Sequence, residues 1–409
     1  MTGSRGAEAQ AAPLQGIKVI EFTHMVMGPT AGVILGDLGA DVIKVEPLKG
    51  DNTRRLKGSG AGYFPMYNRN KRSIALDLKH PEGKAVAQRL VHSADIVLEN
   101  FRPGTMAKLG LDYESLSSEH PGLIYCSLKG FLSGPYENRV ALDEVTQMMG
   151  GLAYMTGLPD RPLRAGSSVI DITGGMFGVI AILSALHQRR ETGQGSHVTS
   201  ALFETTAFLV GQHMAQQAVS GEPPPPMSVR QSAWAVYDIF ELDSGNRLFV
   251  GIVSDTLWQR FCEEFELPDW AADEALASNA GRVAARDSLL PAIRELFAPM
   301  TLPSLSERLD RAGLPFSPIN TPGDLFDDPH LTASGGLLPI HLTEGEHAGT
   351  EAALPRLPVE FGEHKPALHK DLPAVGAHSL EVLRELGLED NELESLAAAG
   401  VIGSYGVSR

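Results

Sequence analysis

The stretch GIKVIEFTHMVMGPTAGVILGDLGADVIKVEP, residues 16–47, decides the fold of this chain. Residues 17–22 and 41–46 are rich in valine and isoleucine, which favour β-strands. Residues 30–39 between them are small and apolar, as in a helix that packs closely. Strand, helix and strand within so short a span form a βαβ unit, which implies a parallel sheet with helices on its faces.

The same alternation returns twice further along the chain. GKAVAQRLVHSADIVLENF, residues 83–101, reads as a helix followed by a buried strand that ends near Asn100. PGLIYCSLKGF, residues 121–131, adds another strand-like run. At least four strands therefore alternate with helices before residue 132, which predicts a doubly wound, Rossmann-like α/β domain.

A proline-rich break, SGEPPPPMSVRQSA at residues 220–233, indicates the exit to a second domain. WAVYDIFELDSGNRLFVGI, residues 234–252, then predicts a hairpin of two alternating strands with its turn near Gly245 and Asn246. Amphipathic helices are expected over 255–266, 284–297 and 303–312. We predict a large domain over 14–222, a smaller α+β domain over 223–328, and a return to the large domain over 329–409.

Composition excludes several classes of partner. The 409 residues carry a net charge of −16, so nucleic acids and anionic membranes are poor partners. No apolar stretch reaches about 20 residues without polar interruption, and we expect a cytoplasmic protein. The two cysteines have no metal-site or disulfide spacing, and the histidines are scattered, so no metal site is predicted. FTHMVMGP after the first strand has one glycine where a dinucleotide site needs three, and no Gly-x-Ser-x-Gly elbow opens a helix.

One carboxylate and one basic segment remain as candidates for chemistry. Asp171 stands at the start of a long apolar run in AGSSVIDITGGMFGVIAILSALHQRR, residues 165–190. It is either the N-cap of a buried helix or a nucleophile that the helix N-terminus keeps ionised. Lys71 and Arg72 precede an apolar, strand-like run, and cations in such a loop would suit a phosphorylated ligand.

Several segments together resemble the class III CoA-transferase family, the formyl-CoA and carnitine CoA-transferase type. The matching stretches include LQGIKVIEFTHMVMGP, LGDLGADVIKVEP, NRNKRSIALDLKHPEG, ADIVLENFRPGTMAKLGL and GSSVIDITGG. The resemblance runs from about residue 14 to the C-terminal LGLEDNELESLAAAGVI. It implies a large and a small domain, two subunits interlocked as a homodimer, and an acyl-CoA and a small carboxylic acid as substrates. It implies no permanently bound cofactor.

The resemblance also implies roles for individual residues. Asp171 would be the nucleophile that forms a mixed anhydride with the acyl group and then an aspartyl-CoA thioester. Gly174 and Gly175 would leave room for backbone donors to the oxyanion. The resemblance places these residues at CoA: His24, Met25, Lys71, Arg72, Asn100, Phe101 and Lys108.

Departures from the family pattern bear on the substrate. Val26 replaces a glutamine of formyl-CoA transferases, Pro47 replaces a basic residue, and the glycine run of a mobile lid is missing, which disfavours formyl-CoA and oxalate. We favour a donor such as succinyl-CoA and a dicarboxylic acceptor. Its remote carboxylate could bind Arg164, with Arg139 and Arg230 as further candidates.

Two alternatives share the fold. A 2-methylacyl-CoA racemase needs a basic histidine where this chain has Leu142. A non-catalytic CoA-binding subunit would not need Asp171.

Overall fold

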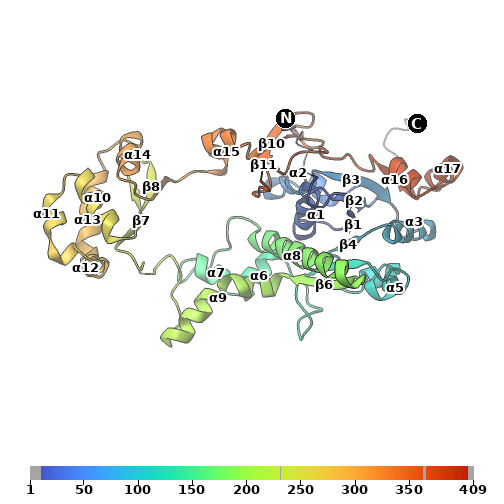
Figure 1. Ribbon diagram of the computed structural model, residues 1–409, viewed down its shortest axis with the longest axis horizontal. Coiled ribbons are helices and arrows are strands. Elements are labelled where there is room, and N and C mark those ends of the chain that lie inside the picture. The colour runs from blue at the N-terminus through green and yellow to red at the C-terminus, as the bar shows by residue number, and fades with distance from the viewer. Residues whose placement is uncertain (1–10, 231, 363–364, 404–409) are drawn as a thin grey trace, which may run out of the picture. The chain divides into compact units, whose positions relative to one another are not determined.

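The computed structural model describes residues 11–230, 232–362 and 365–403, which form two compact units. Among these residues, one unit comprises the chain up to Ser228 together with the part from His330 onward, and the other is Val229–Pro329 (Figure 1). The divisions fall within a few residues of the predicted boundaries at 222 and 328. The larger unit is thus assembled from the two end portions of the chain.

A seven-stranded sheet forms the centre of the larger unit. Its strand order is β12-β3-β2-β1-β4-β5-β6, and the pairs among β1 to β6 are parallel, whereas β12 is antiparallel to β3. The order 3-2-1-4-5-6 is that of a doubly wound sheet, so this prediction is confirmed. The strands are β1 (Lys18–Phe22), β2 (Asp41–Glu46), β3 (Lys71–Leu76), β4 (Ile96–Glu99), β5 (Ile124–Lys129), β6 (Ser196–Ala201) and β12 (Ile402–Gly403).

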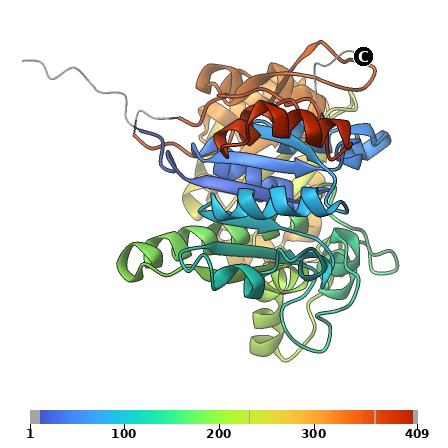
Figure 2. The same cartoon turned by 90° about the vertical axis from the view of Figure 1, so that its right-hand side faces the viewer.

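Helices cover both faces of this sheet. On one face α1 (Met27–Asp37) and α8 (Val169–Thr192) enclose a core that includes Val19, Val42 and Leu98. On the other face α3 (Pro81–His92), α16 (Ser379–Glu385) and α17 (Asp390–Ala398) enclose a second core. Figures 1 and 2 show the C-terminal helices, in red, beside the first strands, in blue.

Shorter elements complete the larger unit. They are η1 (Asn52–Arg55), η2 (Gly58–Gly60), α2 (Tyr63–Tyr67), α4 (Thr105–Leu109), α5 (Tyr113–Ser117), α6 (Asp143–Met149), α7 (Leu152–Thr156), α9 (Leu202–Ser220), α15 (Pro329–Ser334), β10 (Leu337–His341) and β11 (Glu351–Pro355). Helix α15 begins at Pro329, the last residue of the smaller unit. Strands β10 and β11 form an antiparallel pair of their own.

The smaller unit is an antiparallel three-stranded sheet with helices. Strands β7 (Val236–Glu241) and β8 (Arg247–Ile252) form the predicted hairpin, and β9 (Phe316–Pro318) pairs with β8. Gly245 has φ +81° in the turn, a conformation that glycine adopts without strain. The remaining elements are α10 (Asp255–Glu264), α11 (Pro268–Ala272), η3 (Glu274–Leu276), α12 (Asn279–Ala284), α13 (Arg286–Phe297), α14 (Leu302–Arg311) and η4 (Pro322–Asp327). The predicted α+β character is confirmed.

Two glycines let α8 lie directly against α1. A Cβ at Gly175 would come 2.6 Å from the Met27 carbonyl oxygen, and one at Gly174 would come 2.7 Å from the Met27 Cε. Backbone atoms of α1 cannot move aside as a flexible side chain can. The close approach of the two helices therefore requires glycine at position 175.

By length and composition α8 could also cross a membrane, although only 39% of its most apolar window is buried. Asp171, Thr173 and Ser184 interrupt this helix, so the expectation that no apolar stretch reaches about 20 residues without polar interruption is not contradicted. Its packing against α1 and β6 is that of a core helix.

Replacement of Gly175 should destabilise the larger unit. Gly175→Ala should lower the free energy of unfolding by about 1–3 kcal/mol, because the added methyl group overlaps the backbone of α1. Urea unfolding followed by circular dichroism measures this. Gly211→Ala in α9 is the matched control, since no heavy atom lies within 4 Å of its Cβ position, and there alanine should be neutral or stabilising. Equal effects at the two sites would contradict the packing argument.

Candidate active site

A pocket of about 340 Å³ opens at the carboxyl ends of the parallel strands, where doubly wound sheets bind their ligands. Segments that follow β1, β4 and β5 contribute to its wall, and so do α6 and the start of α8. Its lining includes His24, Asn100, Lys129, Leu142, Arg164 and Asp171. The structure therefore brings together the predicted nucleophile and three of the predicted CoA contacts, His24, Met25 and Asn100.

Asp171 lies in the first turn of α8. The hypothesis that it is the N-cap had placed it about one turn earlier, just before the helix. The N-cap is Ser168, whose side chain makes no capping hydrogen bond. The amides of Ile170 and Asp171 instead donate to Oδ2 of Asp143, at 2.9 and 3.1 Å. The N-cap interpretation of Asp171 is therefore wrong, and a carboxylate from α6 takes the capping position.

This arrangement also contradicts the expectation that the helix N-terminus keeps Asp171 fully ionised. Burial, together with the negative charge of Asp143, raises the pKa of the Asp171 carboxyl to about 7, although the positive charge of Arg164 opposes the shift. The favourable end of the helix dipole acts on Asp143 rather than holding Asp171 ionised. A carboxylate with a raised pKa is a stronger base, and hence a better nucleophile once ionised.

Arg164 reaches the same pocket from the segment before α8. Its Nη1 donates to Oε1 of Glu144 at 2.6 Å, and its Nη2 lies 3.6 Å from Oδ1 of Asp143. Glu144 is 60% exposed at its side chain, so this pair is accessible to solvent. The guanidinium thus already holds one carboxylate at the pocket.

The turn after β1 presents His24 and Met25. The amide of His24 donates to Oδ1 of Asn100 at 3.0 Å, and Nδ2 of Asn100 donates back to the His24 carbonyl at 2.8 Å. The His24 ring stacks on Phe101, with ring centroids 5.7 Å apart. Met25 has φ +64°, which is uncommon outside glycine and turns its side chain toward solvent. Burial lowers the pKa of His24, so its ring is neutral at pH 7.

A second pocket, of about 330 Å³, adjoins the first through His24 and Met25. Its other walls come from Phe101, from the end of β2 and from the loop that follows, including Pro47 and Asp51. Four predicted CoA contacts, His24, Met25, Asn100 and Phe101, therefore border one or both pockets. Together the pockets offer an elongated surface to a long, flexible ligand.

Lys71 lies in β3 and not in a loop, and its amine is fully buried. Its Nζ lies 2.8 Å from Oε2 of Glu21, and burial, opposed by Glu21, lowers its pKa to about 8. An amine without exposed surface cannot contact CoA, so this prediction is wrong. The same buried cluster includes Lys44, whose Nζ donates to the Thr23 carbonyl at 2.9 Å and so holds the turn before His24.

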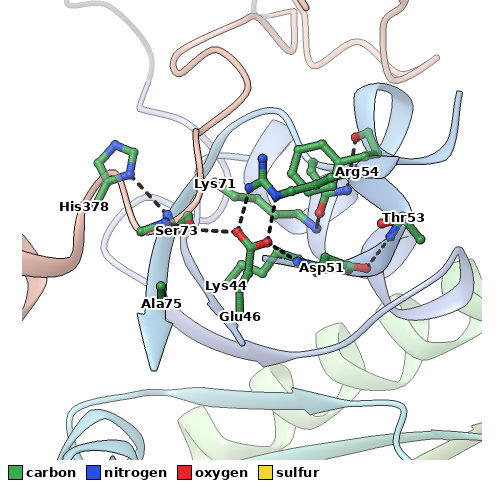
Figure 3. Close-up of polar contacts among 12 residues, drawn as sticks. Lys44, Glu46, Asp51, Thr53, Arg54, Lys71, Ser73, Ala75 and His378 are labelled. Atoms are coloured by element: carbon green, nitrogen blue, oxygen red, sulfur yellow. Dashed lines mark hydrogen bonds and ion pairs between the residues drawn. The ribbon is translucent and has the colours of Figure 1, made fainter. Parts of the chain in front are cut away.

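Figure 3 shows the outer part of this cluster, where Arg54 and Ser73 bind Glu46 from two sides. The guanidinium of Arg54 contacts both carboxylate oxygens of Glu46, at 2.7 and 2.8 Å. The Ser73 hydroxyl donates to Glu46 at 2.6 Å, and Asp51 pairs with Lys44 at 3.1 Å. Each buried charge is therefore matched by an opposite one, as a low-dielectric interior requires.

Arg72 points to the opposite end of the sheet. It pairs with Asp41, the first residue of β2, and with Glu381 and Glu385 of α16. Three carboxylates hold the guanidinium at the amino ends of the strands, away from the pocket at their carboxyl ends. The prediction that Arg72 binds CoA is therefore wrong as well.

Three other predicted residues lie apart from the reacting groups. Gly174 and Gly175 are buried within α8, where each amide is directed to the carbonyl four residues before it. They serve helix packing: Met27 of α1 fills the space beside them, so the prediction that they leave room for donors to an oxyanion is wrong. Lys108 is exposed on α4 and lines neither pocket, so its phosphate contact stays a prediction.

Sequence reasoning missed Asp143 and Lys129 as parts of the site. Lys129, the last residue of β5, pairs with Glu99 at 2.6 Å and donates to the Phe101 carbonyl at 2.9 Å. Its position at a strand end was the available signal. Asp143 gave a weaker one, since an acid before a helical run is expected to cap its own helix.

Comparison with known proteins assigns the chain to a family. A match to CoA-transferase family III spans residues 14–379. Succinate–glutarate CoA-transferase of Agrobacterium fabrum is 35% identical over 91% of this chain and 96% of that protein. Succinyl-CoA–D-citramalate CoA-transferase of Chloroflexus aurantiacus is 33% identical over 95% of this chain and 98% of that protein.

A solved structure agrees with this match. A CaiB/BaiF family protein from Brucella suis superposes with a TM-score of 0.81 at 36% identity, covering 92% of this chain and all of that one. The resemblance seen in the sequence is thereby confirmed. The chain belongs to CoA-transferase family III, and it is an enzyme of that family.

Proposed function

We propose that the enzyme moves CoA from succinyl-CoA to a dicarboxylic acid such as glutarate or a methylated acid of similar length. The observation that carries this proposal is the pocket in which the Asp171 carboxylate lies near the Arg164 guanidinium. A carboxylate can accept an acyl group, and a guanidinium can hold a second carboxylate in a bidentate pair. The names of the two relatives, which pair succinate or succinyl-CoA with a dicarboxylic acid, support this choice of substrates.

In the first half of the proposed reaction, an oxygen of Asp171 attacks the thioester carbonyl of succinyl-CoA. The carbon–sulfur bond breaks, CoA leaves as the thiolate, and a mixed anhydride remains. The thiolate then attacks the Asp171 carbonyl carbon. The anhydride bond breaks, succinate departs, and Asp171 carries CoA as a thioester.

The second half repeats these steps with the acceptor acid. A carboxylate oxygen of the acceptor attacks the Asp171 thioester carbon and expels the thiolate, which gives a second anhydride. The thiolate attacks the acyl carbon of the acceptor, and the Asp171 carboxylate is restored. Each step exchanges one activated carbonyl for another, so no nucleotide is consumed.

The proposed CoA path follows the two adjoining pockets. The turn of His24 and Met25 and the side chains of Asn100 and Phe101 would contact the pantetheine arm. Lys108 remains a candidate for a phosphate. A neutral His24 and the carbonyls at this turn suit the amide groups of pantetheine, which are themselves uncharged.

The racemase alternative lacks the histidine that its chemistry needs. Leu142, which stands where that chemistry needs a histidine, lines the pocket, with 60% of its surface exposed. A leucine side chain can neither take nor return a proton. This position therefore favours transfer over racemisation.

We further propose that the enzyme is a cytoplasmic homodimer with interlocked subunits. In the single chain, one stripe of α8 exposes Met176, Ile180 and Leu183, and the side chain of Phe208 on α9 is 72% exposed. Apolar surface of this kind on neighbouring helices is typical of an interface. A second copy would cover it and would account for the membrane-like composition of α8.

Removal of the nucleophile should abolish transfer. Asp171→Ala should reduce CoA exchange between succinyl-CoA and glutarate on the order of a thousandfold or more, while CoA still binds. Chromatography of the CoA esters measures exchange, and calorimetry measures binding. Asp160→Ala, which removes an exposed acid nearby, is the control. Exchange at the unmodified rate in Asp171→Ala, or α-deuteration of a chiral 2-methylacyl-CoA without exchange, would contradict the proposal.

The pH dependence should report the pKa of Asp171. Only the ionised carboxylate attacks, and this acid is ionised above its pKa, so kcat/KM should fall about tenfold for each unit below about pH 7. Steady-state rates from about pH 5 to about pH 9 test this. A profile that stays flat down to about pH 5 would show a carboxylate of ordinary acidity and contradict the geometry of the site.

Arg164 should determine preference for a second carboxylate. Arg164→Met should raise KM for glutarate roughly tenfold or more, because a charged hydrogen-bonded pair is lost. It should leave KM for a monocarboxylic acid of equal length nearly unchanged. Initial rates with both acids measure the difference, and Arg161→Met, at a neighbouring exposed arginine, is the control. An equal rise with both acids would exclude recognition of the remote carboxylate.

A further inference from the structure

Asp143 is the most firmly held carboxylate of the pocket. It is only 7% exposed. Its Oδ2 accepts the amides of Ile170 and Asp171, and its Oδ1 accepts Nε2 of Gln147 at 2.5 Å. The side-chain Oε1 of Gln147 in turn accepts a hydrogen bond from the Ala165 backbone amide at 2.8 Å, which fixes the orientation of the Gln147 side-chain amide. Three hydrogen-bond donors therefore hold the Asp143 carboxylate in place.

The position that Asp143 occupies matters for its neighbour. The first amides of a helix attract anions, and at α8 Asp143 takes these amides for itself. Asp171 stands beside this fixed charge, and the positive group facing both, Arg164, is shared with Glu144. The other titratable groups at this pocket are His24, Tyr63 and Tyr67 of α2, and Lys129, which pairs with Glu99.

We propose that Asp143 is a positioning residue whose fixed negative charge shifts Asp171 toward its covalent, uncharged forms. This inference rests on the proposed nucleophilic role of Asp171. The free enzyme carries two neighbouring carboxylates that repel each other. In the anhydride and in the CoA thioester, the Asp171 carboxyl has become a neutral acyl group, and that repulsion is absent.

The consequence is a change in the equilibrium between the aspartyl-CoA thioester and the free Asp171 carboxylate. When the thiolate attacks the anhydride, the negative charge leaves with succinate and does not return to the protein. The aspartyl-CoA thioester is therefore favoured over the free carboxylate by the amount of the lost repulsion. The acceptor must then restore the charge in the last step, which keeps the cycle reversible.

Asp143→Asn tests this inference because it removes the charge and keeps an oxygen that can accept the Ile170 and Asp171 amides. Enzyme equilibrated with fixed succinyl-CoA and succinate is acid-quenched, and intact-protein mass spectrometry gives the ratio of thioester to free enzyme. We expect this ratio to fall about tenfold, matching a fall of about one unit in the acid limb of kcat/KM. Glu204→Gln, which removes an acid from the first turn of α9, should change neither quantity.

Other outcomes are equally decisive. An unchanged ratio and an unchanged acid limb in folded Asp143→Asn would overturn the inference and leave Asp143 a purely structural cap. If Asp143→Asn does not fold, Asp143→Ser keeps a hydroxyl acceptor at the helix and carries the same test. If the unmodified enzyme forms no thioester, the proposed function itself fails, and the inference with it. Loss of the thioester in Asp171→Ala confirms where CoA is attached.

Discussion

The close contact between α1 and α8 is the constraint on which the active site depends. Without a side chain at Gly175, the second turn of α8 lies against the Met27 carbonyl of α1. Because α1 begins directly after the turn that carries His24, this contact sets the start of α8 beside that turn. A protein interior transmits such contacts with little slack. Helix packing therefore fixes the distance between the groups that would bind CoA and the carboxylate that would react with it.

Much of the fold could be predicted from the sequence, and the exceptions share one cause. Apolar strand-like runs that alternate with helical ones predicted β1, α1, β2, β4 and β5, because the buried side chains of these elements are mostly hydrophobic. Strand β3 was in part mistaken for a loop, since Lys71 and Arg72 at its start looked solvent-exposed. In the structure these cations are buried against carboxylates from distant segments, among them Glu21 and Glu381. Hydropathy cannot reveal an ion pair whose partner lies tens or hundreds of residues away.

The sequence predicted those site residues whose own side chains face the pocket. It did not predict residues that act on the site by holding another residue in position. Asp171, His24 and Asn100 were found because they stand at the ends of elements that the sequence defines. Asp143 was not, since it caps a helix that begins 26 residues further along the chain. The glycine pair Gly174–Gly175 was recognised but misinterpreted. Adjacent glycines in a sequence indicate that something packs closely against the backbone, but they do not indicate whether it is a substrate or another helix.

The strand β12 has a consequence for the order in which the protein is made. It pairs with β3 and completes the edge of the large sheet, yet it contains residues 402 and 403 of 409. During synthesis the ribosome releases the whole smaller unit, residues 229–329, before that edge can be covered. Nascent chains would thus expose β3 as an unpaired edge strand until Ile402 and Gly403 have been synthesised, and an open edge invites pairing with other chains. The larger unit therefore completes its sheet only after the whole smaller unit has been synthesised.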